Sequence, residues 1–200
     1  MQHNSSLKYK ELTQAIKACQ VCVKFLPNPP LPVVSFSPEA KILVIGQAPG
    51  KKVHQSGVPF DDKSGENLRA WLGVTKEQFY DANLFGIVPM GFCFPGSSPK
   101  GGDLPPRTEC APQWHQHIFD ITKKVELILL IGHYAQKYYL GKTVKKNLTE
   151  TVNTFQDYLP KYFPLVHPSP LNFRWHGKNK WFKTDVLPIL QYKIKKIINN

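Results

Sequence analysis

Four cysteines form the clearest candidate metal site in the sequence. Cys19 and Cys22 are separated by two residues, whereas Cys93 and Cys110 are separated by sixteen. Thiolates are what an iron–sulfur cluster or a structural zinc ion requires, and composition also allows two disulfides or four unrelated buried thiols. We expect a soluble, cytoplasmic protein, in which disulfides are disfavoured. On these residues alone, iron and zinc stay equally open.

Two short loops, far apart in the chain, carry further polar side chains. The sequence GQAPG spans residues 46–50 and HPSP spans residues 167–170, about 120 positions later. Each follows a predicted strand, and open α/β sheets bind ligands beyond the carboxyl ends of their strands. We therefore expect the two loops to meet at one crevice. A single histidine after a strand usually has a structural role. Because His167 is followed by Pro-Ser-Pro and is paired with the GQAPG loop, we expect it to be a residue of the site.

Hydrophobic patterning predicts strands that alternate with helices and that place these loops. The predicted strands span residues 41–46, 84–88, 125–132 and 163–166. The predicted helices span residues 5–18, 64–72, 112–122 and 133–140, and an amphipathic helix closes the chain from residue 177 onward. This alternation indicates an α/β fold with a central parallel four-stranded sheet flanked on both faces. We expect one domain over residues 1–200.

Two of the connecting segments are too rich in proline or glycine for regular structure. Residues 27–38 contain five prolines, which predicts an extended connector. Residues 89–110 form a long loop, and loops of that length usually serve a function.

The ends of the second predicted helix carry capping residues. Ser64 is its expected N-cap, and Gly73 is expected to end it.

The composition favours a polyanionic partner. The sequence has 26 Lys and Arg against 14 Asp and Glu, a formal net charge of +12, which suits nucleic acid or an anionic membrane surface. The basic clusters at residues 142–146 and 193–196 fit a solvated surface equally well. No apolar run approaches the roughly 20 residues of a membrane span, and the first residues lack an apolar signal region. We expect no membrane association.

Three motifs together resemble the uracil-DNA glycosylases, particularly the iron–sulfur members called family 4. They are GQAPG, HQSGVPFDDKSGENLRAWLG at residues 54–73, and HPSP. In that family a G-E-A/G-P-G loop, a G-x-P-F segment and an H-P-S loop converge on an extruded nucleotide in a three-layer α/β/α sandwich. The resemblance covers most of the chain. It implies a DNA glycosylase that hydrolyses the N-glycosidic bond of uracil or another deaminated base in base excision repair.

The resemblance also implies roles for individual residues. Phe60 matches the aromatic that stacks on the flipped base, which needs a π-face to replace its lost stacking neighbours. His167 matches the histidine that donates a hydrogen bond to the base carbonyl oxygen, where negative charge gathers during cleavage. Ser169 and nearby backbone amides would bind flanking phosphates. Leu171 or Arg174 would occupy the space that the flipped nucleotide leaves in the duplex.

The GQAPG loop departs from the family pattern at its water-activating position. Gln47 stands where family 4 usually has Glu, and Ala48 falls on the catalytic Asp of the GQDPY loop of other uracil glycosylases. Gly46 and Ala48 are expected to bind substrate, and Gln47 is expected among the catalytic residues. Two acids, Asp61 and Asp62, directly follow the GVPF motif and are the nearest candidates to orient water or stabilise the sugar cation. We assign the catalytic role to Asp62.

The position that reads the base departs as well. Family 4 carries an Asn about four residues before its third cysteine, and counting back from Cys93 reaches Pro89. Asn83 lies too far upstream to take its place. Because an Asn side chain reads the uracil edge with a paired donor and acceptor, its loss leaves the identity of the base open.

The spacing of the four cysteines matches the family 4 ligand pattern. The resemblance therefore implies a 4Fe-4S cluster with a structural role, and zinc is the alternative. Such a cluster would tie the first helix and the proline connector to the long loop. We expect DNA as the partner and a monomer in solution. The alternative function is a catalytically inactive, metal-cluster-stabilised nucleic-acid-binding protein with the same fold.

Overall fold

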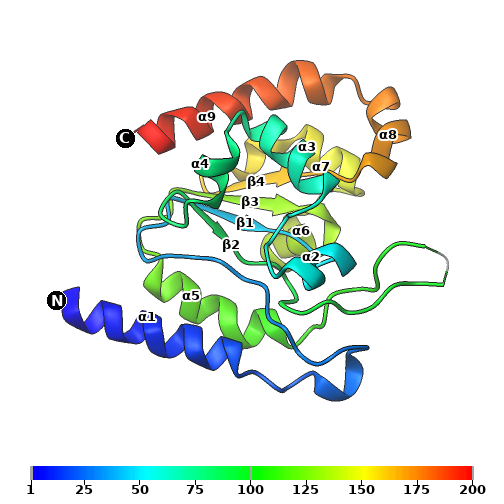
Figure 1. The fold of residues 1–200 in the computed structure, drawn as a ribbon. Coiled ribbons are helices and arrows are strands. Elements are labelled where there is room, and N and C mark those ends of the chain that lie inside the picture. Colours follow the sequence, from blue (N-terminus) through cyan, green and yellow to red (C-terminus); the bar gives the residue numbers. More distant parts are fainter. Residues whose placement is uncertain (1, 100, 200) are drawn as a thin grey trace.

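A parallel four-stranded sheet lies at the centre of the computed structural model, which describes residues 2–99 and 101–199. The strands are β1 (Ile42–Ile45), β2 (Phe85–Ile87), β3 (Leu127–Ile131) and β4 (Tyr162–Leu165). They lie in the order β2-β1-β3-β4, and every neighbouring pair is parallel (Figure 1). The first three strands lie within the predicted segments, β4 begins one residue before its predicted segment, and the predicted sheet is confirmed.

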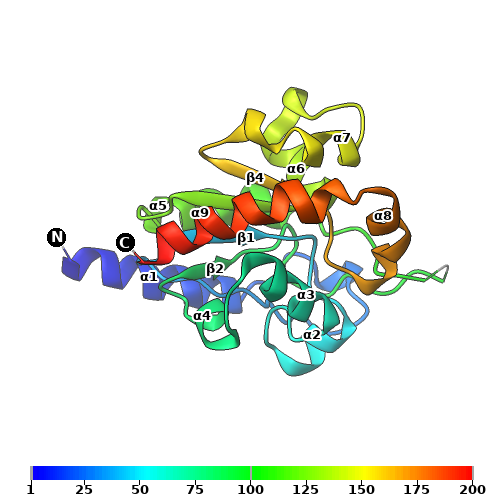
Figure 2. The same cartoon turned by 90° about the horizontal axis from the view of Figure 1, so that it is seen from above.

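Helices cover both faces of this sheet, because successive strand residues point to opposite sides. In β1, Ile42 and Val44 belong to one hydrophobic core, whereas Leu43 and Ile45 belong to the other. The first core is covered by α3 (Lys63–Leu72), α4 (Lys76–Tyr80), α7 (Leu148–Asn153) and α9 (Leu187–Asn199). The second is covered by α1 (Gln2–Lys17), α5 (Gln116–Ile121) and α6 (Gly132–Leu140). Figures 1 and 2 show the resulting three layers.

The predicted helices are present, but some of them begin or end at other residues than predicted. The cap of α3 is Asp62 and not Ser64, because the Asp62 carboxylate accepts the free Gly65 amide at the start of the helix, while Gly73 ends it as expected. The closing helix begins with a π-helical turn at Phe182–Val186, after which Pro188 falls in the first turn of α9, where proline is tolerated. The sequence patterns did not indicate four short helices, namely α2 (Lys51–Ser56), α4, α7 and α8 (Phe173–Lys178).

The proline connector is extended, as predicted, and it lies beside β2. The Val33 amide donates to the Phe92 carbonyl oxygen at 2.7 Å, and Ser35 forms an antiparallel bridge with Ile87. The predicted loop at residues 89–110 contains no helix or strand among its described residues up to residue 109, apart from one isolated bridge between Ser97 and Asp103, and Cys110 begins the next helical segment. Within the described part of the chain, no helix is long and apolar enough to cross a membrane.

A buried histidine connects the start of the long loop to α6, on the second face of the sheet. His115 is 2% exposed; its Nδ1 hydrogen-bonds with the Tyr139 hydroxyl and its Nε2 with the Pro89 carbonyl oxygen at 3.1 Å. A carbonyl oxygen only accepts, so Nε2 carries the ring proton and Nδ1 accepts from Tyr139. Burial lowers the pKa of His115 to about 4, and the hydrogen bond to Pro89 opposes this shift. The folded protein therefore holds His115 neutral.

We expect the free energy of unfolding to decrease as the pH falls from about 6.5 to about 4. Unfolded His115 binds a proton near pH 6.5 and folded His115 near pH 4, so the unfolded state binds more protons in this window. The difference corresponds to on the order of 3 kcal/mol. Urea titrations at pH 7.0 and 4.5 measure it: His115→Gln should lose less stability between the two pH values than wild type, whereas exposed His117→Gln should match wild type. An unchanged pH dependence in His115→Gln would contradict the assignment.

Candidate active site

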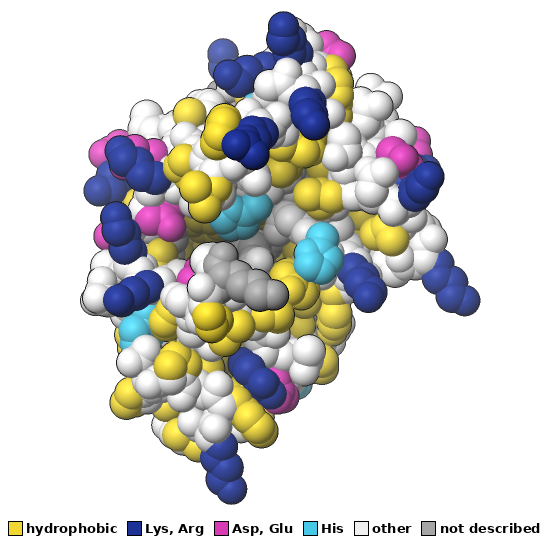
Figure 3. All heavy atoms as spheres, turned by 90° about the vertical axis from the view of Figure 1, so that its right-hand side faces the viewer, with side chains coloured by type: hydrophobic (Ala, Val, Ile, Leu, Met, Phe, Trp, Pro, Cys, Tyr) yellow, Lys and Arg dark blue, Asp and Glu magenta, His cyan; other side chains and the backbone are white. Residues whose placement is uncertain are grey.

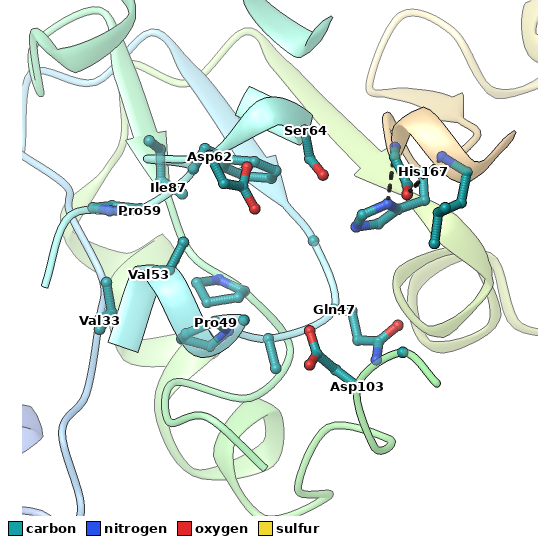
Figure 4. A pocket seen from close by; sticks show the side chains of 18 residues that line it. Val33, Gln47, Pro49, Val53, Pro59, Asp62, Ser64, Ile87, Asp103 and His167 are labelled. Carbon is teal, nitrogen blue, oxygen red and sulfur yellow. Dashed lines mark hydrogen bonds between the residues drawn. The ribbon is translucent and has the colours of Figure 1, made fainter. Parts of the chain in front are cut away.

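A cavity of about 340 Å³ lies beyond the carboxyl ends of the strands, where the GQAPG, GVPF and HPSP segments and the long loop meet. Pockets for small ligands have volumes of roughly 300–1,000 Å³, so this one can hold a nucleobase-sized group. The prediction that GQAPG and HPSP share one crevice is confirmed. Figure 4 shows the lining side chains pointing into the space between β1, α3 and the long loop. The expected site residues that line it are Gly46, Gln47, Ala48, Phe60, Asp62, His167 and Ser169.

His167 follows β4, and its loop is held by hydrogen bonds on several sides. The Ser169 amide donates to Nδ1 of the imidazole at 3.2 Å, and the Asn172 side chain donates to the His167 carbonyl oxygen at 2.7 Å. Asn67 on α3 donates to the Pro168 carbonyl oxygen at 2.8 Å. These bonds orient the ring toward the cavity before any ligand arrives (Figure 4). Sequence reasoning missed Asn67, whose role depends on a contact between distant segments.

The protonation state of His167 follows from these contacts. Burial lowers the pKa of the imidazole, and the nearby charge of Asp62 opposes the shift. Because Nδ1 accepts the Ser169 amide, a neutral ring carries its proton on Nε2. His167 can therefore donate one hydrogen bond from Nε2 without bringing a positive charge into the cavity.

The GQAPG loop is bonded to the long loop by both its main chain and a side chain. The Met90 amide donates to the Gly46 carbonyl oxygen at 2.9 Å, and the Gly91 amide donates to the Gln47 carbonyl oxygen at 3.0 Å. The Gln47 side chain donates through Nε2 to the Leu104 carbonyl oxygen at 3.0 Å. The amide group of Gln47 thus fixes the far arm of the long loop against the cavity.

Phe60 is held between the end of β1 and the start of α3. Its ring contacts Gly46, where an added Cβ would lie 3.4 Å from Cζ, and it packs edge-on against Phe79 at a centroid distance of 6.1 Å. The backbone has a φ of 55°, in the left-handed region that bulky residues rarely adopt. The Tyr80 hydroxyl donates to the Phe60 carbonyl oxygen at 3.2 Å and helps to hold this conformation. The ring position is therefore fixed by packing and by a strained backbone.

Gly65 is required for this position of Phe60, so we expect Gly65→Ala to destabilise the protein. A Cβ at residue 65 would lie 1.8 Å from the Phe60 carbonyl oxygen, which must then move. Such overpacking costs about 1–3 kcal/mol, although Ala ordinarily favours a helix interior over Gly. Urea unfolding should show this loss, and Gly177→Ala on α8, with open space around its Cβ, should be neutral or slightly stabilising. Equal stabilities of the two variants would contradict the expected clash.

Two carboxylates line the cavity, and sequence reasoning identified one of them. Asp62 uses Oδ1 to accept the Gly65 amide at 2.9 Å, whereas its neighbour Asp61 is exposed and does not line the cavity. Asp103, on the long loop, also lines it. Partial burial raises the pKa of Asp103, and the negative charge of Asp62 raises it further. The only sequence signal for Asp103 was an acid within a long loop rich in glycine and proline.

The position expected to read the base carries no amide side chain. Pro89 lines the cavity, as its place before Cys93 suggests, but it offers no side-chain donor or acceptor. Asn83 lies elsewhere and accepts a hydrogen bond from the Ser37 hydroxyl at 2.7 Å. None of the described residues that line the cavity is an asparagine. The described lining of the cavity therefore lacks the amide that the family resemblance associates with reading a base.

The four cysteines are all free thiols, and all four line one small, mainly apolar cavity below the sheet. Its free volume is only about 10 Å³, and among the described residues no group of three or more His, Cys, Asp and Glu is placed to hold a metal ion. Burial raises the pKa of Cys93 to about 11 and that of Cys110 to about 12. Main-chain groups of Leu31 and Phe92 hydrogen-bond with these two sulfurs and oppose the shifts. The four sulfur atoms are the kind of ligand that a thiolate-bound metal group requires, although the cavity between them has no space ready for such a group.

An arginine lies beside the cysteine cavity. Arg107 forms an ion pair with Glu109 and lies 4.3 Å from the centroid of the Phe25 ring. Burial raises the pKa of Cys22 and the charge of Glu109 raises it further, while Arg107 opposes both through a hydrogen bond and its positive charge. Arg107 thus favours a thiolate at this position.

Basic and apolar side chains surround the mouth of the larger cavity. Figure 3 shows histidines near the centre of this hollowed face, with Lys and Arg side chains distributed around it. Lys51 and Lys52 on α2 and Arg174 on α8 are exposed. Leu171, at the rim, is 79% exposed, and the neighbouring Phe173 is 65% exposed. The face combines positive charge with protruding apolar groups.

The comparisons with known proteins agree with this geometry. The family model described as Uracil DNA glycosylase superfamily matches residues 34–191. A similar curated protein is the Type-4 uracil-DNA glycosylase of Sulfurisphaera tokodaii, which is 26% identical over 143 residues. This alignment covers 66% of the present chain and 61% of that protein, so the chain spans about three fifths of the relative's length. The match at residues 34–191 covers most of the chain and contains all three motifs, and the chain belongs to the uracil DNA glycosylase superfamily.

Proposed function

We propose that the protein is a DNA glycosylase that hydrolyses the N-glycosidic bond of uracil or another deaminated base in DNA. The observation that carries this proposal is a single cavity lined both by His167, whose Nε2 is the free donor of a neutral ring, and by the aromatic residue Phe60. A flipped base needs both a surface on which to stack and a donor for its carbonyl oxygen. The relative named as a Type-4 uracil-DNA glycosylase supports the same activity.

Bond cleavage depends mainly on how the cavity treats the departing base. The base stacks on Phe60, whose ring cannot withdraw because Gly46 and Phe79 pack against it. As the C1′–N bond lengthens, electrons accumulate on the base and its carbonyl oxygen becomes more negative. His167 donates its Nε2 proton in a hydrogen bond to that oxygen, and a pre-oriented donor stabilises such charge without reorganisation. Gly46 and Ala48 have no bulky side chains and leave room for the base.

DNA binding uses the charged and apolar groups at the mouth of the cavity. Lys51, Lys52 and Arg174 bind backbone phosphates, which is how basic proteins gain most of their sequence-independent affinity. The Ser169 hydroxyl already accepts the Leu171 amide at 3.2 Å, so its proton is available to a phosphate oxygen. Exposed Leu171 fills the space that the flipped nucleotide leaves in the duplex.

The four cysteines hold a 4Fe-4S cluster in this proposal. Support comes from their common cavity, from the two main-chain hydrogen bonds to sulfur and from the nearby Arg107, all of which suit thiolates around a metal group. The cluster would supply structural cross-linking between the segment at Cys19 and the two ends of the long loop. Zinc bound by the same thiolates is the alternative, and it predicts a colourless protein.

Single-turnover assays on duplexes with one uracil, hypoxanthine or xanthine test the proposed activity. We expect release of at least one of these free bases by wild-type protein, with an alkali-labile abasic site as the second product. Because Pro89 stands where an asparagine would read uracil, the relative rates of release of the three bases show which base the cavity prefers. DNA binding that weakens with salt but yields no product from any substrate would instead favour the binding-only alternative. Neither the family match nor the named relative supports that alternative.

A further inference from the structure

We propose that Asp103 is the catalytic residue that activates the attacking water, a role that rests on the proposed glycosylase function. The GQAPG loop offers no carboxylate, because Gln47 and Ala48 occupy its two expected positions. Asp103 comes from a different part of the chain, the long loop, and its carboxylate enters the same cavity as His167 (Figure 4). The long loop thus supplies the acid that the strand-end loop lacks.

The local structure fixes Asp103 against the GQAPG loop. The Asp103 carboxylate lies close to Gly50, where an added Cβ would be 3.1 Å from its Oδ2. The next residue, Leu104, is held through its carbonyl oxygen by Gln47 and donates its own amide to the Gly96 carbonyl oxygen at 2.8 Å. Asp103 itself forms the bridge with Ser97. The carboxylate is therefore placed by both arms of the loop and by the Gln47 side chain.

Asp103 is better suited to accept a proton than the other acid in the cavity. Asp62 already uses Oδ1 to cap α3, and moving it would release the Gly65 amide. The pKa of Asp103 is raised first by burial and then by the charge of Asp62, so its carboxylate is a stronger base than an ordinary aspartate. Figure 4 shows the two carboxylates on different walls of the cavity, Asp62 from the start of α3 and Asp103 from the long loop beside Gln47. Both wall positions leave the interior open to substrate and water.

The proposed reaction uses one water molecule and side chains that line the cavity. The C1′–N bond breaks and its electron pair leaves with the base, which is stabilised by the hydrogen bond from His167. A water oxygen forms a new bond to C1′ and transfers one proton to the Asp103 carboxylate. The products are the free base, which takes up a proton from solvent, and a sugar with a C1′ hydroxyl. Asp103 then returns its proton to solvent. Gln47 acts here as a positioning residue through Leu104.

The test compares Asp103→Asn, Asp62→Asn and exposed Asp61→Asn in single-turnover base release from the best wild-type substrate. We expect Asp103→Asn to be slower by about 10²-fold, as for the loss of a general base, with DNA affinity unchanged, and Asp61→Asn to match wild type. Adding azide to Asp103→Ala should restore base release and yield a glycosyl azide detectable by mass spectrometry, because azide attacks C1′ without deprotonation. Circular dichroism confirms that each variant is folded.

The outcomes separate this inference from the function on which it rests. Wild-type protein without base release on any substrate contradicts the proposed function. Active wild type with Asp103→Asn within about threefold of it overturns the role of Asp103. A large loss in Asp62→Asn together with a normal Asp103→Asn also overturns it, and assigns water activation to Asp62. A slow Asp103→Ala that azide fails to rescue overturns water activation as the lost step.

Discussion

Replacing His167 by alanine should slow base release by about 10²–10³-fold at saturating enzyme, the effect of removing one pre-oriented donor from a developing anion. Three hydrogen bonds hold the loop that carries His167, and all three are present without a ligand. Their donors are the Ser169 amide and the side chains of Asn172 and Asn67. The donor therefore needs no rearrangement when the base arrives. Single-turnover quench experiments measure the rate, and filter binding with the intact substrate measures affinity.

The matched control for this variant is His133→Ala. His133 also follows a strand, β3, but it is exposed and does not line the cavity, so its removal should leave the rate unchanged. His167→Gln should recover part of the lost rate, since its side-chain amide can still donate. The role would be contradicted if the alanine variant lost DNA affinity and base-release rate in the same proportion, because a transition-state donor affects mainly the rate.

The fold and the meeting of the two loops were predictable because both follow from local patterns. Continuous apolar runs such as 127–131 predict buried parallel strands, and the ends of parallel strands share one edge of the sheet. Phe60 and His167 were also predictable, since each lies within a motif of the family. None of these predictions required knowledge of contacts between distant side chains.

The residues that sequence reasoning missed all depend on such contacts. Asn67 falls within the predicted helix at residues 64–72, yet its side-chain amide donates to the carbonyl oxygen of Pro168, which is 101 positions away. Asp103 lies 57 positions after Gly46, on a loop whose path is set by Gln47 and by its own turns. Ser64 is the predicted helix cap and Asp62 is the observed one; both residue types cap helices well, and only the bond to Gly65 distinguishes them.

Replacing one of the four cysteines should have the largest effect on stability. Anaerobically purified protein should be brown and contain about four irons per chain, whereas Cys110→Ser should lose most of that iron. The cysteine cavity joins the segment after α1 to both ends of the long loop, which otherwise has no regular structure among its described residues. We expect an unfolding free energy lower by on the order of 5 kcal/mol, below the roughly 10–16 kcal/mol of small zinc domains because the α/β core remains.

Iron analysis, absorption spectra and thermal unfolding of wild type, Cys110→Ser and Ala111→Ser test this expectation. Ala111 is the buried neighbour of Cys110 in sequence, so its serine variant also introduces a buried hydroxyl but removes no sulfur, and it should keep its iron. Limited proteolysis should cleave Cys110→Ser within residues 94–108 faster than wild type. Colourless wild type with one zinc would overturn the iron assignment. Unchanged stability in a metal-free Cys110→Ser would show instead that the connector and the long loop hold their positions through protein contacts alone, such as the bond between Val33 and Phe92.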